Sequence, residues 1–240
     1  MIVEVCVTSV RSIENAYRAG ADRVELCSAL GVGGITPSIG LLEQAVKLNK
    51  LPIHCLIRPR EGHFIYDAKE IAVIESDIIN AKRVGCSGVV IGVLTPEFNI
   101  DIPLLKRWVE MASPMHLTFH RAFDVVAHPE KALQELITLG FHTVLTAGQE
   151  EKAERGIENL IQWHQKFGHK ISIMPGSGIN PSNCEQFNKA GFPAIHLSGL
   201  KVLPSIKIPS TVNCAMSFLN QELTESHYDT LQEVVKLVKD

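Results

Sequence analysis

The sequence of 240 residues carries little net charge and few aromatic side chains. Its formal net charge is −3 at pH 7, and phenylalanine, tryptophan and tyrosine together make up 6% of the residues. It has no cluster of lysine and arginine and no basic stripe interleaved with aromatic residues. Because nucleic-acid binding depends on a basic surface that faces the phosphate backbone, we expect no nucleic-acid partner.

Long apolar runs are also missing. No stretch approaches the roughly 20 apolar residues that a membrane-spanning helix needs. The opening residues, MIVEVCVTSV, have no basic segment and place Glu4 inside the apolar run, which argues against a secretory signal. We therefore expect a cytoplasmic protein that has no membrane partner.

The cysteines are scattered, and none forms the CxxC spacing of a structural zinc site. Together with the missing export signal, this favours free thiols over a disulfide framework. We interpret four of the six as packing or surface residues: Cys55, Cys86, Cys184 and Cys214.

What the sequence does contain is a regular alternation of strand-like and helix-like runs. The strand-like runs are short, rich in β-branched residues and bounded by Gly, Pro or Ser, and they cover 2–9, 23–28, 52–59, 88–94, 116–123, 143–147, 170–176 and 194–199. Helical spacing fills the intervals, for example 38–49, 67–85, 129–140 and 150–168, and a last helix is expected near the C-terminus. Parallel strands need helical crossovers, and eight of them can close into a ring. The pattern therefore predicts an α/β fold, a single (β/α)8 TIM-type barrel over residues 1–240. A doubly wound open sheet is the alternative, but its GxGxxG turn after the first strand is missing.

Alternation within the predicted strands turns polar side chains toward the barrel axis. In the first strand, Val3 and Val5 would face the helices, whereas Glu4 and Cys6 would face inward. The same count turns a further set inward: Glu25, Cys27, His54, Arg58, Thr118, His120, Met174, His196 and Ser198. An ordinary barrel interior contains Val, Ile and Leu instead. One interpretation is a buried structural network with Arg58 between Glu4 and Glu25.

The other interpretation is a pocket with Glu4, Glu25, Arg58 and His120 in its floor and wall. Active sites in this fold lie at the C-terminal ends of the strands, which favours Arg58 and His120 over the two glutamates. An imidazole can exchange protons near neutral pH, and a guanidinium can bind a carboxylate or phosphate through two hydrogen bonds.

Two glycine turns follow the seventh and eighth predicted strands, MPGSGIN and HLSG. Barrels often bind phosphate with these two loops, through backbone N–H groups. The candidate cradle consists of Gly176, Ser177, Gly178, Ser198 and Gly199. The alternative is two tight turns that need glycine for a positive φ.

Cys6 and Cys27 lie on adjacent predicted strands and point the same way. Since parallel neighbours are about 4.8 Å apart, the two thiolates could bind one soft ion such as Cu(I). The alternative is that both cysteines pack as small buried hydrophobic residues.

Several blocks of the sequence resemble those of the CutC family, whose proteins are named for copper homeostasis. The blocks occur in family order from Met1 to about Ser198, and the tail at 199–240 follows the family only loosely. They are EVCVTSVRSIENAYRAGADRVELCSALGVGGITPSIGLL, IRPREGHFIY, GVVIGVLTPEFNID, LTFHRAFD, VLTAGQ and IMPGSGI.

The resemblance implies a cytoplasmic (β/α)8 barrel, commonly a homodimer, in which Cys6 and Cys27 are the proposed Cu(I) ligands. It also implies that FHRAFD places His120, Arg121 and Asp124 at the barrel mouth. Our first expectation is thus a CutC-like protein of copper homeostasis that binds Cu(I) and has no organic cofactor. The alternative is a barrel enzyme, an isomerase, lyase or hydrolase, that acts on a small anionic or phosphorylated substrate. Its candidate residues are Glu4, Glu25, Arg58, His120 and Asp124.

Overall fold

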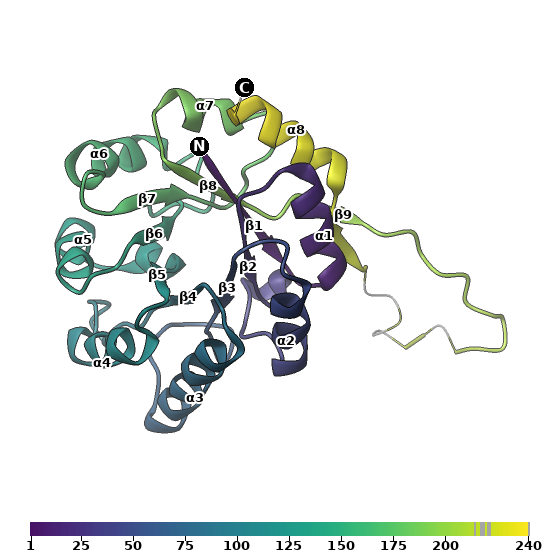
Figure 1. Ribbon diagram of the computed structural model, residues 1–240, viewed down its shortest axis with the longest axis horizontal. Helices are drawn as coiled ribbons and strands as arrows, with labels where there is room; N and C mark the ends of the chain where they lie inside the picture. Colours follow the sequence, from purple (N-terminus) through teal and green to yellow (C-terminus); the bar gives the residue numbers. More distant parts are fainter. Residues whose placement is uncertain (214, 217–218, 220–221, 240) are drawn as a thin grey trace.

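The computed structural model describes residues 1–213, 215–216, 219 and 222–239, and it contains the predicted ring of eight parallel strands inside a layer of helices (Figure 1). The strands are β1 Ile2–Val7, β2 Arg23–Leu26, β3 Ile53–Leu56, β4 Gly88–Ile91, β5 His116–Phe119, β6 Thr143–Thr146, β7 Ser172–Pro175 and β8 Ala194–Leu197. Their order in the sheet is β7-β6-β5-β4-β3-β2-β1-β8. The ring closes between β7 and β8 through an isolated parallel bridge between Gly176 and His196. The prediction of a (β/α)8 barrel is confirmed.

The helices connect successive strands and cover the outside of the ring (Figure 1). They are α1 Val10–Ala19, α2 Ile39–Leu48, α3 Ala68–Val84, α4 Ile102–Ala112, α5 Pro129–Thr138, α6 Ile157–Phe167, α7 Cys184–Lys189 and α8 Tyr228–Lys239. Two short 3₁₀ turns, η1 Leu30–Val32 and η2 Arg121–Val125, follow β2 and β5. Within the described residues, none of the helices combines the length and the apolar character that crossing a bilayer requires.

Local signals explain where several helices begin and end. The Asp67 side chain accepts hydrogen bonds from the first turn of α3, and the Glu70 carboxylate accepts one from the Asp67 backbone N–H, which together form a capping box. The α3 helix then stops at Gly85, whose φ of 96° is left-handed. At α2 the N-cap is Ser38. Thr36 precedes Pro37, a pattern typical of an N-cap, but its hydroxyl forms hydrogen bonds with the backbone of Arg58 and does not cap α2.

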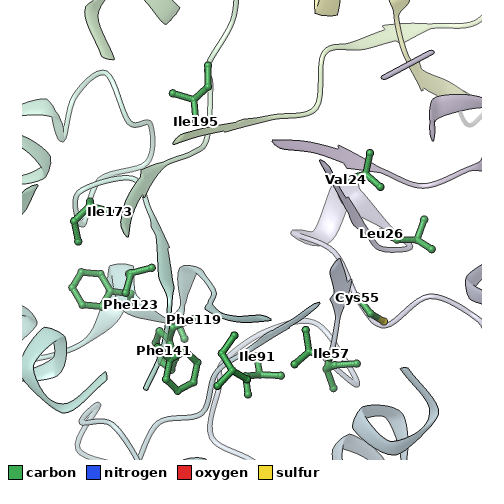
Figure 2. Close-up of a cluster of buried hydrophobic side chains, with 14 of the residues drawn as sticks. Val24, Leu26, Cys55, Ile57, Ile91, Phe119, Phe123, Phe141, Ile173 and Ile195 are labelled. Carbon is green, nitrogen blue, oxygen red and sulfur yellow. The ribbon is translucent and has the colours of Figure 1, made fainter. Parts of the chain in front are cut away.

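The outer face of the strands packs against the helices and forms the main hydrophobic core. Val24, Leu26 and Cys55 lie on the outer side of the ring, and Phe119 does the same on the opposite wall (Figure 2). A smaller group lies inside the ring and consists of Cys6, Cys27, Leu56 and Val90. The two clusters separate the side chains as the alternation predicted. The polar and thiol side chains that the alternation turned inward therefore lie in the barrel interior.

After β8 the chain leaves the barrel before it returns to form α8. Strands β9 Leu200–Val202 and β10 Thr224–Ser226 pair antiparallel, and residues 203–213 extend away from the barrel (Figure 1). The side-chain amide of Asn15 on α1 donates to Glu225 at 2.8 Å, which attaches this excursion to the first helix. This region corresponds to the tail that resembled the family only loosely.

Candidate functional site

A cavity of about 320 Å³ opens at the C-terminal ends of the strands. Its lining comes from strand ends and loops that are distant in sequence, including the loops after β2, β3 and β7. The ionisable side chains among the lining residues are Cys6, Glu25, Arg58, His120, Arg121 and His196. Of the residues that the sequence proposed for a pocket, Glu4 and Asp124 are not part of this lining.

The two thiols of the predicted metal site meet inside the barrel. The Sγ atoms of Cys6 and Cys27 are 3.5 Å apart, and the Cys6 thiol donates to Oε1 of Glu25 at 3.4 Å. The register of β1 and β2 causes this contact, because it sets Cys6 directly beside Glu25. His196 on β8 joins them, so that ligand atoms of Cys6, Glu25 and His196 all lie within 4.8 Å of one another. Sequence reasoning had not assigned His196 to this group.

The surroundings of Cys6 and Glu25 favour the protonated form of both side chains. The hydrogen bond with Cys27, together with burial, raises the pKa of Cys6 well above its usual value. Burial raises the pKa of Glu25, although the nearby His196 opposes that shift. Cys6 is therefore a thiol at neutral pH, with Glu25 as its acceptor.

Glu4 belongs to a buried ion cluster on the first strands. Its carboxylate pairs with Arg23 on β2, and Oε1 lies 2.8 Å from Nδ1 of His196. Burial opposes ionisation of Glu4, but the His196 hydrogen bond and the charge of Arg23 outweigh it and hold the pKa well below its usual range. Burial alone would lower the pKa of His196, yet Glu25 and Glu4 raise it above its ordinary value. Arg23 was missed by sequence reasoning, although it shares the inward parity of Glu25.

The interpretation that Arg58 lies between Glu4 and Glu25 is wrong. The Arg58 Nη1 donates to the backbone oxygens of Val32 at 3.0 Å and Gly34 at 2.9 Å, and Nη2 donates to Gly62 O at 2.9 Å. Arg58 lies at the end of β3, where its guanidinium ties the loop after β2 to the loop after β3. The guanidinium also stacks over the ring of Phe64 at 5.0 Å from the centroid.

His120 follows β5 and holds one tautomer. Its Nδ1 accepts a hydrogen bond from the backbone N–H of Ala122 at 3.2 Å, so the proton of the neutral ring is on Nε2. Burial, assisted by the charge of Arg58, lowers the pKa of His120 to about 3. The ring packs against Phe64 at 4.8 Å between centroids. His120 is therefore a neutral hydrogen-bond donor at the cavity wall.

Asp124 fastens two loops together. One of its oxygens accepts from the backbone N–H groups of Ala147 at 2.9 Å and Gln149 at 3.2 Å, and from the hydroxyl of Thr146. The other oxygen accepts from Nε of Arg121 at 2.7 Å. These contacts join the η2 turn after β5 to the loop after β6. Its carboxylate is thus committed to holding the mouth in shape.

The candidate phosphate cradle is only partly directed at the cavity. The Gly176 N–H donates to Thr146 O at 3.0 Å, and the Ser177 hydroxyl donates to Glu151 O at 2.8 Å, so both groups are engaged elsewhere. Gly199 does not belong to the lining. The N–H groups of Gly178 and Ser198, two lining residues, donate to no backbone acceptor among the described residues.

The remaining cysteines lie apart from this site. Cys55 and Cys184 belong to the core outside the ring of strands, as does Cys86. This agrees with their interpretation as packing residues. Cys214 is outside the described residues.

Comparison with known proteins points to one family. The profile of the CutC family matches residues 1–201. A protein named CutC from Proteus mirabilis is 38% identical over 238 residues, which covers 99% of this chain and 95% of the relative. A protein named CutC from Vibrio cholerae is 42% identical over 206 residues, which covers 85% of this chain and 81% of the relative.

The same family appears among solved structures. A Streptococcus agalactiae protein, named as a copper homeostasis protein CutC, superposes with a TM-score of 0.79 at 29% identity, covering 82% of this chain and 98% of that chain. The resemblance found in the sequence blocks is thus confirmed by the family profile, by close relatives and by the fold. The chain belongs to the CutC family.

Proposed function

We propose that this protein binds Cu(I) as cargo, in the cytoplasm, through the thiolates of Cys6 and Cys27. The observation that carries the proposal is the 3.5 Å separation of the two Sγ atoms inside the barrel. Soft thiolate ligands select Cu(I) over hard cations. The name of the Streptococcus agalactiae relative, a copper homeostasis protein, supports the same assignment.

The donor set fits a soft ion. Metal–thiolate bonds measure about 2.3 Å, so one ion can contact two sulfurs at this separation. His196 supplies a further candidate ligand, because its ring lies in the same cluster as Cys6 and Glu25. The two thiols are buried, but Cys6 belongs to the cavity lining, which gives the ion a route from the barrel mouth.

Metal binding at this site requires the thiols to lose their protons. Thiolate, and not thiol, binds the metal, so uptake of the ion releases protons from the protein. Oε1 of Glu25 lies 3.4 Å from the Cys6 sulfur, so Glu25 can take up the leaving proton when it is in its carboxylate form.

A Cu(I) titration tests the proposal. Under anaerobic, reducing conditions, the wild-type protein should compete with a chromophoric Cu(I) chelator, whereas Cys6→Ser and Cys27→Ser should lose most of that competition. The matched control is Cys184→Ser, a buried thiol outside the barrel interior, which should bind as the wild type does. Unchanged affinity in both Cys6→Ser and Cys27→Ser would refute the proposal.

A further inference from the structure

Arg58 is a buried cation that pairs with no carboxylate at salt-bridge distance in the described part of the chain; Glu61 attracts it only from further away, and the phenol of Tyr66 lies nearby. Its relative exposure is 6%, and its guanidinium donates to the neutral carbonyl oxygens of Val32, Gly34 and Gly62. Its Nε–H has no acceptor among the described residues. Buried charges are normally paired, because an isolated one costs several kcal/mol. The lack of a direct ion pair is thus a feature that the copper site does not explain.

A second unpartnered donor lies in the same cavity. His120 is 4% exposed and lines the cavity, and its Nε2–H finds no acceptor among the described residues. The Nδ1 atom is fixed as an acceptor by Ala122, so Nε2 cannot accept in its place. Phe64 packs on both Arg58 and His120, which holds the two donors in one wall. Two buried donors without acceptors indicate a site for an acceptor that arrives from outside.

The rest of the lining is suited to the same kind of ligand. The backbone N–H groups of Gly178 and Ser198 add donors that have no backbone acceptor among the described residues. Arg121 also lines the cavity, but its charge is already paired with Asp124. Leu30 and Ile179 supply apolar walls. The volume of about 320 Å³ is far larger than a metal ion needs. A cavity of this size is within the range of sites that bind small organic molecules.

We propose that the barrel mouth binds a small organic oxyanion, a carboxylate or phosphate ester, with Arg58 and His120 holding its charged oxygens. The neutral part of the ligand lies between Leu30 and Ile179. The anion site shares this cavity with Cys6 but uses other residues of its lining, and it does not depend on copper binding. If the protein is a barrel enzyme, this site specifies the class of its ligand but not the reaction.

Calorimetric titration of the metal-free, reduced protein tests this site. The probes are glycerol 3-phosphate, glycerate and inorganic phosphate, with glycerol as the neutral control. At least one of the two organic anions should bind, and glycerol should not. If glycerol 3-phosphate binds and glycerate does not, the site takes phosphate esters; the reverse result assigns it to carboxylates. Binding of inorganic phosphate alone, or of none of the probes at 10 mM, would overturn the proposal.

Variants then locate the bound anion. Arg58→Gln should weaken binding about tenfold to a hundredfold, the usual effect of losing a charged hydrogen bond. The matched control is Arg60→Gln, because Arg60 is paired with Glu70 and lies outside the lining. His120→Asn should also weaken binding, since asparagine can keep the cap on the Ala122 N–H but lacks a donor at the Nε2 position. Wild-type affinity in His120→Asn would count against the site.

One measurement needs no substitution. Titration of the wild-type protein with the tighter-binding probe should shift the NMR signals of the His120 Nε2 and Arg58 Nε groups, and the signal of His169, an exposed imidazole, should stay in place. Unmoved His120 and Arg58 signals at saturation would place the anion elsewhere and refute the proposal. Cys27→Ser should retain anion binding, and Arg58→Gln should retain Cu(I) binding, so the two proposals can fail separately.

Discussion

Nδ1 of His196 lies 2.8 Å from Oε1 of Glu4, which joins the last strand of the barrel to the first. Arg23 on β2 pairs with the other oxygen of the same carboxylate. One buried side chain thus connects β8, β1 and β2, next to the place where the ring closes through the single bridge between Gly176 and His196. We infer that Glu4 serves the closure of the barrel, whereas the cavity above it serves binding.

Removing the charge of Glu4 should therefore destabilise the barrel. In Glu4→Gln, the largely buried Arg23 guanidinium loses its counter-charge, and breaking a buried pair in this way costs about 3–5 kcal/mol. Denaturant unfolding would measure the loss. The double variant Glu4→Gln/Arg23→Met should recover part of it, because no unpaired cation remains. The control is Glu130→Gln, which breaks an exposed pair with Lys166 and should cost at most about 1 kcal/mol. A Glu4→Gln cost as small as that of the control would contradict this role.

Stability should fall on acidification in part because of His54. Burial lowers the pKa of this imidazole from 6.5 to about 4, although the charge of Glu4 opposes the shift. Between these two pH values the unfolded chain binds a proton at His54 that the folded chain does not, so the free energy of unfolding decreases as the pH falls. Above pH 6.5 both states are neutral at this position and the contribution is fully present.

The corresponding measurement compares the wild type with His54→Gln. Over pH 6.5 to 4, the free energy of unfolding of the wild type should fall more steeply than that of the variant, by up to about 1.4 kcal/mol per pH unit. Urea unfolding at half-unit pH intervals gives both curves. Parallel curves would mean that His54 titrates alike in the folded and unfolded chain.

Alanine substitutions at Gly34 and Gly191 distinguish the cost of a left-handed backbone from the cost of crowding beside the thiols. Gly34 and Gly191 both have a left-handed φ, of 83° and 82°. A Cβ on Gly34 would lie 2.7 Å from Cδ2 of Leu56 and 3.4 Å from Cβ of Cys27, whereas a Cβ on Gly191 would meet nothing within 4 Å. Alanine at Gly191 should thus cost only the left-handed strain of about 1–2 kcal/mol.

Alanine at Gly34 should cost about 1–3 kcal/mol more than alanine at Gly191, because the crowded wall must also shift. Since Cys27 is part of that wall, Gly34→Ala should also weaken Cu(I) binding, and Gly191→Ala should leave it unchanged. Thermal unfolding and the chelator competition provide the two readouts. Equal effects of the two substitutions would show that Gly34 is required for its φ alone.

The placement of the thiols illustrates what could be predicted and what could not. Alternation in β1 and β2 put Cys6, Glu25 and Cys27 on one face, and the structure brings all three together. The same reasoning turned His196 inward but could not join it to them. Its place near Cys6 depends on the register of β8 against β1, which sets His196 beside Glu4. Neither strand carries a local signal for that register.

Arg58 and Asp124 show more clearly what could not be predicted from the sequence. Arg58 was assigned to a pocket from strand alternation and Asp124 from the family resemblance, but Asp124 instead accepts hydrogen bonds from the N–H groups of Ala147 and Gln149 on another loop. Arg58 faces carbonyl oxygens and not the two glutamates that were proposed as its partners. Charge and position along a strand do not reveal which backbone groups a long side chain will reach.

Strand periodicity, glycine stops and signature blocks are local properties of the chain, and they were enough to predict the barrel, the inward face of each strand and the family. Local properties could not predict which inward residues share a cavity and which are engaged in ion pairs or loop contacts. Strand register and ring closure bring together groups far apart in sequence, and burial then sets their charge states.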